Sequence, residues 1–139
     1  MSRLPIRIHE DKSNGWVRIG DADPAPQGQS GAYLDSTYRI HELGTDQSPQ
    51  LIEARYLPGT SIGVHAHDHD EIVYVVEGEM LVGNRILGPG SSVFVAARTL
   101  YSFSAGAAGL RFLNFRPLRD DSHISRSEFL ARRTAADAA

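Results

Sequence analysis

Short runs of β-branched, aromatic and other apolar residues alternate with glycine and proline from about residue 50 onward. The runs end at turn-forming pairs such as Pro58-Gly59 and Gly83-Asn84, which are typical strand boundaries. Several short strands at a spacing of roughly 8–12 residues indicate an antiparallel sandwich or a small barrel. We therefore expect an all-β fold with strands over residues 51–57, 72–76, 80–82, 92–95, 100–104 and 110–115.

The first 48 residues carry weaker patterns. Residues 16–19 predict a short strand, and residues 21–31, which are rich in proline and glycine, predict a loop. Residues 33–43 alternate loosely and are compatible with an edge strand. We expect an N-terminal strand arm over residues 1–48, followed by a barrel core over residues 49–118.

The period of the pattern changes at the C-terminus. Ser125 can cap a helix, and Glu128 follows three residues later, as in a capping box. Ile124 and Phe129 occupy the two positions of a hydrophobic staple. A short helix is expected over residues 125–137 as a flank or lid on the barrel, with partner binding as the alternative. The whole chain, residues 1–139, has the length of one domain.

Composition and charge narrow the classes of function. The chain is 41% hydrophobic and has a net charge of −3, from 14 basic and 17 acidic residues. No clustered basic field is present, so nucleic-acid binding is not expected. The absence of cysteine excludes disulfides and thiolate chemistry. No apolar signal core or membrane-length run is found, and we expect a cytoplasmic protein without membrane association.

A histidine cluster at residues 65–71 carries the candidate chemistry. In a strand, residues two apart share a face and lie about 6.6 Å apart. His65 and His67 can therefore direct both imidazoles at one metal ion. A straight strand would place Glu71 about 20 Å from His65, so the chain must bend at Asp68-His69-Asp70. Glu71 would then open the next strand and complete the site, while His69 would lie at the tip of the bend and not bind the metal.

The alternative is a solvated polar loop with surface histidines. Three of the six histidines fall within five residues, between two apolar strands and ahead of a carboxylate. This arrangement favours a metal site with His65, His67 and Glu71 as ligands.

The same residues carry a family resemblance. Gly59, His65, His67, Glu71 and Gly78 have the spacing of the first cupin motif, without deviation. The chain therefore resembles the cupin superfamily over about residues 50–116. This resemblance implies a double-stranded β-helix, or jelly-roll barrel, in which the two histidines and the glutamate bind a metal. It also implies a homodimer.

The second cupin motif is degraded. Counted from Gly90, its proline, second glycine, histidine and asparagine fall on Ala96, Arg98, Tyr101 and Ala105. Tyr101 stands where the family has a fourth, histidine ligand. It is a candidate phenolate ligand, a candidate catalytic acid or base, or a packed core residue. We expect its side chain to face the barrel interior.

Without a fourth protein ligand, two histidines and one carboxylate leave open coordination positions, as in non-haem iron oxygenases. The leading hypothesis is a dioxygenase-type enzyme acting on a small molecule, with a divalent transition metal. Iron or manganese is favoured, and zinc, nickel or copper is compatible. The alternatives are a non-catalytic metal- or ligand-sensing module, and a metal-dependent lyase or isomerase that uses Tyr101 as its acid or base.

Other polar residues are weaker candidates. Arginine and asparagine side chains on predicted strands would orient an anionic substrate if they faced inward, although we expect most of them to face solvent: Arg55, Arg111, Asn114 and Arg116. Trp16 is expected in the core or an interface. His9, His41 and His123 are isolated in the sequence and are not expected to be ligands.

Overall fold

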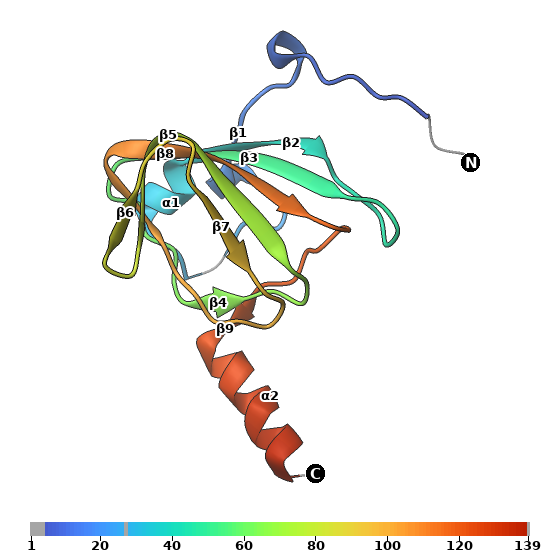
Figure 1. The fold of residues 1–139 in the computed structure, drawn as a ribbon, viewed down its shortest axis with the longest axis vertical. Coiled ribbons are helices and arrows are strands. Elements are labelled where there is room, and N and C mark those ends of the chain that lie inside the picture. The colour runs from blue at the N-terminus through green and yellow to red at the C-terminus, as the bar shows by residue number, and fades with distance from the viewer. Residues whose placement is uncertain (1–4, 27, 139) are drawn as a thin grey trace.

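The computed structural model describes residues 5–26 and 28–138. Its main sheet is antiparallel, and its strand order is β1-β2-β3-β8-β5-β6, with β7 also paired to β5 (Figure 1). The bounds of these strands are β1 Val17–Arg18, β2 Thr37–Glu42, β3 Gln50–Tyr56, β5 Glu71–Val82, β6 Arg85–Leu87, β7 Ser92–Val95 and β8 Ser104–Arg116. A second, two-stranded sheet pairs β4 (His65–Ala66) with β9 (Ile124–Ser125).

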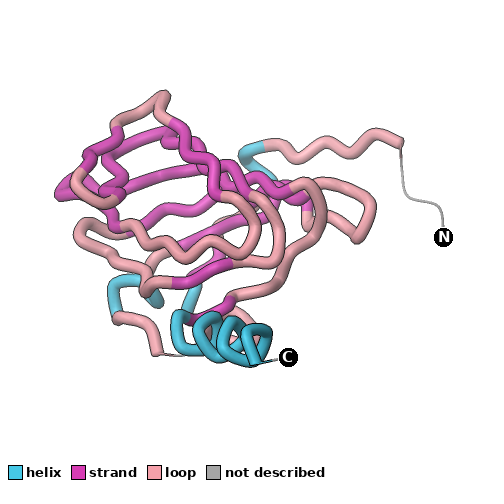
Figure 2. Tube along the Cα trace, turned by 60° about the horizontal axis from the view of Figure 1, so that its bottom comes forward, coloured by secondary structure: helices cyan, strands magenta, loops and turns pink. Residues whose placement is uncertain are grey.

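The strands wrap around one interior and confirm the all-β jelly-roll prediction (Figure 2). Strand β5 shows the alternation that this requires, because Val73 and Val75 are buried while Ile72 and Tyr74 are exposed. Aromatic rings fill much of the core. The rings of Tyr56 and Phe103 are stacked with centroids 5.8 Å apart, and Phe112 packs edge-on against both.

The prediction of an edge strand over residues 33–43 is only partly right. Residues Gly31–Asp35 form the short helix α1, because Ser30 caps its start by accepting a hydrogen bond from the amide of Tyr33. The strand that follows, β2, lies between β1 and β3 and is therefore not at the edge. Residues from the expected N-terminal arm thus extend the main sheet.

Two further strand predictions are corrected. Strand β5 continues through Gly78 instead of ending there. Its register with β8 shifts on either side of this glycine, and these irregularities let the two strands stay paired. Gly78 has a φ of +76°, a backbone conformation that glycine adopts without strain. Residues 100–103 do not form a strand, although Tyr101 makes an isolated bridge to His65. Strand β6 was not predicted.

The first and last described segments of the chain lie at different ends of the barrel in Figure 1. The N-terminal segment includes the 3₁₀ helices η1 (Asp11–Ser13) and η2 (Ile19–Asp21), and its first described residues extend away from the sheet. Helix α2 (Arg126–Ala138) begins after Ser125, whose hydroxyl caps it by accepting from the amide of Glu128, as predicted. Within the described residues, no helix has the length and apolar character needed to cross a bilayer.

Candidate functional site

The His65–His67 segment is held between two other parts of the chain. His65 pairs with Ser125 of β9 on one side, and its backbone exchanges two hydrogen bonds with Tyr101 on the other. Both imidazoles are buried, at 3% and 8% exposure, and their centroids are 5.0 Å apart. The chain bends at Asp68 and His69, as predicted, and Glu71 opens β5.

Backbone carbonyls fix the tautomers of both histidines. Nδ1 of His65 lies 2.8 Å from the carbonyl oxygen of Gly63, and Nδ1 of His67 contacts the carbonyl oxygen of Ser122. A carbonyl only accepts, so each Nδ1 carries the proton and each Nε2 presents a lone pair. Burial lowers the pKa of His65 to about 4 and also lowers the pKa of His67. Both rings are therefore neutral near pH 7, as metal-ligating imidazoles must be.

Glu71 is a buried carboxylate, and both of its oxygens accept hydrogen bonds. Its Oε1 accepts from the phenol of Tyr101, and its Oε2 accepts from Nδ2 of Asn114 at 2.9 Å and from Arg116. Burial alone would raise the pKa of Glu71, but these hydrogen bonds and the Arg116 charge outweigh it and lower the pKa. Burial and the neighbouring Glu71 charge raise the pKa of Tyr101 above its ordinary value, so the phenol is neutral.

The guanidinium of Arg116 lies between the two kinds of candidate ligand. Its Nη2 is 3.2 Å from Oε2 of Glu71 and 3.4 Å from Nε2 of His67. Its Nη1 is held elsewhere, by Oε1 of Gln50 and the backbone carbonyl of Asp120. Arg116 therefore faces the interior, in contrast to the solvent-facing position expected for most of the strand arginines.

His123, which looked isolated in the sequence, belongs to this site. Its ring stacks on that of His65, with centroids 4.6 Å apart and planes 12° from parallel. Although His123 is isolated in the sequence, β9 brings the residues after Asp120 back to β4 and so places His123 beside His65. No local sequence signal marks this approach, since His123 lies 56 positions after His67. That His123 is not a ligand stays a prediction.

The remaining candidates lie outside the site. His69 donates to Asp120 from the bend, and His41 contacts Glu53. Arg55 lies over the ring of Trp16, at 4.0 Å from its centroid. Arg111, the last of the four strand candidates, pairs with Glu53 and Glu77. Of those four, only Asn114 and Arg116 reach the interior.

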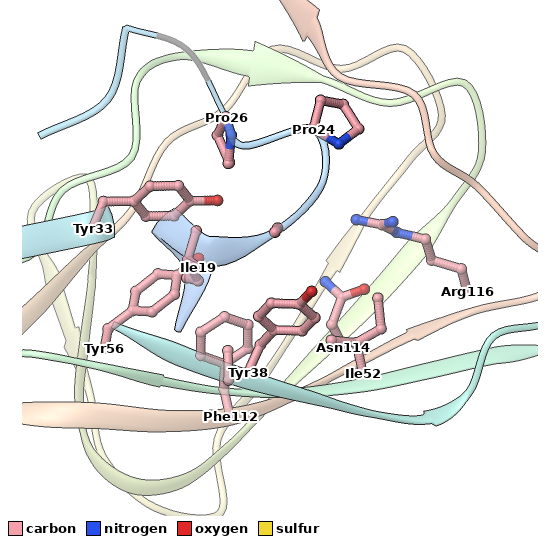
Figure 3. A pocket seen from close by; sticks show the side chains of 12 residues that line it. Ile19, Pro24, Pro26, Tyr33, Tyr38, Ile52, Tyr56, Phe112, Asn114 and Arg116 are labelled. Atoms are coloured by element: carbon pink, nitrogen blue, oxygen red, sulfur yellow. The ribbon is translucent and has the colours of Figure 1, made fainter. Parts of the chain in front are cut away.

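Two neighbouring cavities meet at this site. The first, which we call the histidine cavity, has a volume of about 110 Å³ and is lined by His65, His67, Tyr101 and His123 among others. The second, the aromatic cavity, has a volume of about 270 Å³ and is drawn in Figure 3. Five residues line both cavities: Tyr33, Tyr56, Phe112, Asn114 and Arg116.

The donor chemistry fits a metal ion, but the carboxylate is turned to other partners. The two Nε2 atoms and one carboxylate are suitable ligands for a divalent transition metal. Glu71 does not line the histidine cavity. Its hydrogen-bond partners Tyr101, Asn114 and Arg116 line the cavity in its place. Among the described residues, no three His, Asp or Glu side chains surround a common point as ligands would. Metal binding by all three residues would thus require these side chains, and the Arg116 guanidinium that lies between two of them, to rearrange.

The fold and this site define a small jelly-roll protein with buried histidines at one end of its barrel, and comparisons agree. A model of the cupin domain matches residues 52–115. This match, to the strands of the main sheet, supports a small protein of the cupin superfamily. No match was found among curated proteins.

Solved structures share the fold at low sequence identity. An RmlC-like cupin from Shewanella frigidimarina is 23% identical, with a TM-score of 0.61 over 84% of this chain and 95% of that one. The polyketide cyclase RemF from Streptomyces resistomycificus is 19% identical, with a TM-score of 0.62 over 94% of each chain. An acetylacetone dioxygenase from Acinetobacter johnsonii is 13% identical, with a TM-score of 0.65 over 97% and 95%. At these identities the likeness concerns the fold alone.

Proposed function

We propose that this cupin is a metal-dependent enzyme of the dioxygenase type that acts on a small molecule. The metal ligands in this proposal are His65, His67 and Glu71. The observation that supports it most is the pair of buried, neutral imidazoles whose Nδ1 protons are tied to backbone carbonyls. That arrangement leaves both Nε2 lone pairs for one ion, and such outer contacts are typical of ligating histidines.

Each residue has a defined part in this proposal. The carbonyls of Gly63 and Ser122 hold the two imidazoles in their ligating orientation. Glu71 supplies a negative charge, since its pKa is lowered despite burial. A bound iron or manganese would supply redox chemistry with dioxygen, and three protein ligands leave positions for a substrate. Zinc, nickel and copper remain compatible with the same donors.

A second candidate function rests on Tyr101. Its neutral phenol lines the histidine cavity and donates to Glu71. A phenol placed against a carboxylate is suited to giving or taking a proton at a substrate atom. This geometry supports a metal-dependent lyase, isomerase or cyclase. The structural likeness to both a dioxygenase and a cyclase does not choose between the two candidates.

Metal content tests the ligand assignment directly. We expect the purified wild-type protein, reconstituted with iron, to hold about one ion per chain. His65→Ala and His67→Ala should each lose that ion, while His69→Ala should keep it, because His69 points to Asp120 from the bend. Retention of the metal in both of the first two variants would refute the assignment.

Dioxygen uptake then separates the candidate functions. The iron-loaded protein should consume dioxygen with a β-diketone such as acetylacetone or with an aromatic enol, and His65→Ala should not. Turnover of such a compound without dioxygen uptake would favour the proton-transfer chemistry of Tyr101. Metal binding with no turnover of any tested compound would favour a non-catalytic sensing module.

A further inference from the structure

Arg116 contacts the same atoms that the proposed metal would need. Its Nε and Nη2 lie 3.3 Å and 3.2 Å from Oε2 of Glu71, and its Nη2 lies 3.4 Å from Nε2 of His67. Nε2 of His67 has a single lone pair, so the guanidinium and a divalent cation cannot both bind it, and at Glu71 the two positive charges would repel each other. Arg116 and a metal ion are therefore competitors for Glu71 and His67.

The two edges of the Arg116 guanidinium have different partners. Nη1 donates to the Asp120 carbonyl at 2.7 Å and to Oε1 of the buried Gln50 at 3.2 Å. Neither of these partners is a metal ligand. If Glu71 and His67 bound a metal, Nη1 would keep its contacts with Gln50 and Asp120, and the Nε/Nη2 edge would be free for another partner. That edge is the one that binds a carboxylate with two parallel hydrogen bonds.

The neighbouring aromatic cavity is suited to the body of a flat ligand. Rings of Tyr33, Tyr38, Tyr56 and Phe112 surround it, as Figure 3 shows. Arg116 is the only charged residue among the described residues that line it, and its guanidinium points inward from one side. Its volume of about 270 Å³ lies just below the range of drug-sized sites. The cavity therefore suits one ring with a short polar substituent.

We propose that Arg116 is an anion anchor that metal binding releases, and that the aromatic cavity takes a small conjugated carboxylate or enolate. In the metal-free protein the guanidinium neutralises Glu71. In the metal-loaded protein its free edge pairs with the negative group of the ligand, beside the metal, while the conjugated body packs on the tyrosines and Phe112. This inference rests on the proposed function, since it requires a metal at His65, His67 and Glu71.

Calorimetric titrations of wild type and Arg116→Gln test both halves of this inference. Zn²⁺ serves as a redox-inert metal and benzoate as the anionic probe, with benzamide as its neutral counterpart. We expect Arg116→Gln to bind Zn²⁺ about 10- to 100-fold more tightly, because the repulsion of a positive charge a few ångströms away is gone. The zinc-loaded variant should bind benzoate at least about 10-fold more weakly than zinc-loaded wild type, through loss of a charge-assisted hydrogen bond. Wild type should bind benzoate more tightly with zinc than without, and benzamide weakly in both states.

The opposite signs of the two effects distinguish this role from a structural one. A variant that merely loosened the fold would bind both Zn²⁺ and benzoate more weakly, and that result would overturn the inference, as would unchanged affinities. Arg119→Gln is the matched control, because Arg119 is exposed and pairs with Asp121. Arg116→Lys retains the charge without the two-donor edge, so it should still weaken benzoate binding even if Arg116→Gln fails to fold. Absence of Zn²⁺ binding in wild type, Arg116→Gln and Arg116→Lys alike would instead refute the proposed function.

Discussion

Asp120 accepts two hydrogen bonds from His69, one from the backbone amide and one from ring Nδ1, each 3.0 Å long. The other carboxylate oxygen of Asp120 accepts from the amide and the hydroxyl of Ser122. The Asp120 side chain is only 1% exposed. It therefore ties the loop after β8 to the bend that follows His67, and it places the Ser122 carbonyl on the His67 ring.

Asp120→Asn should weaken metal binding, although the Asp120 side chain contacts none of the three proposed metal ligands. An amide cannot accept at both oxygen positions, so the contacts with His69 and Ser122 cannot all survive. His67 would then lose its fixed orientation, and such outer contacts are worth about 10- to 100-fold in metal affinity. Zinc titration of the variant measures this. Asp121→Asn is the control, because Asp121 is exposed and pairs only with Arg119; equal affinities in the two variants would contradict the role of Asp120.

Tyr101→Phe should retain the metal and lose turnover. In the proposed site the phenol is not a ligand but donates to Glu71, and Glu71 keeps its contact with Asn114 when the hydroxyl is removed. If Tyr101 transfers a proton, turnover should fall by about 10²–10⁴-fold while metal content is unchanged. Tyr74→Phe, on the exposed face of β5, is the control. A phenolate-to-iron colour in the wild-type protein that disappears in Tyr101→Phe would instead make Tyr101 a ligand.

Local patterns were sufficient for most of the fold. Alternation and turn residues placed β3 and β7, and the Ser125 cap placed the start of α2. The errors have local causes. Ser30 competes with strand formation by capping α1, and bulges at Gly78 carry β5 through a predicted end. The homodimer stays a prediction.

The site was harder to predict because half of it comes from distant sequence. His65, His67 and Glu71 form one local motif, so strand geometry and a bend were enough to nominate them. Arg116 and His123 reach them only through the pairing of β8 with β5 and of β9 with β4. A strand pattern does not say whether an arginine faces the barrel or solvent when both faces carry polar residues. The pairing of Arg116 with Glu71 is therefore a property of the tertiary structure.

Gly78→Ala should destabilise the fold far more than Gly59→Ala. Both glycines have φ near +75°, where an alanine costs about 1–2 kcal/mol. A Cβ at Gly59 would meet open space, whereas one at Gly78 would overlap the carbonyl of Gly109 on β8. The Gly78 variant should therefore lose about 3 kcal/mol or more in the free energy of unfolding, measured by urea denaturation. Similar losses of unfolding free energy in both variants would mean that the backbone at Gly109 can move to accommodate the new Cβ at little cost.

The attachment of the N-terminal segment depends on Glu42. Arg7 and His9 both contact its carboxylate, while Ile6 and Ile8 on the same segment are exposed. Hydrogen bonds from Arg7 and then His9 lower the pKa of Glu42 to about 2. A carboxylate with a depressed folded pKa stabilises the folded state fully above its ordinary pKa of about 4.5 and loses that contribution as the pH falls through 2. This attachment should therefore not depend on Glu42 ionisation between pH 5 and 8.

Glu42→Gln should release this segment at every pH. The neutral amide cannot hold a guanidinium and a histidine together, so tryptic cleavage after Arg7 should become several-fold faster at pH 8. The free energy of unfolding should change by less than about 1 kcal/mol, because partly exposed ion pairs contribute little. Glu10→Gln is the control, since Glu10 makes only a long, exposed pair with Lys12. Titration of the wild-type Glu42 carboxyl resonance by NMR should give a pKa near 2, and an ordinary pKa there, with unchanged cleavage in Glu42→Gln, would show that Glu42 does not hold the segment.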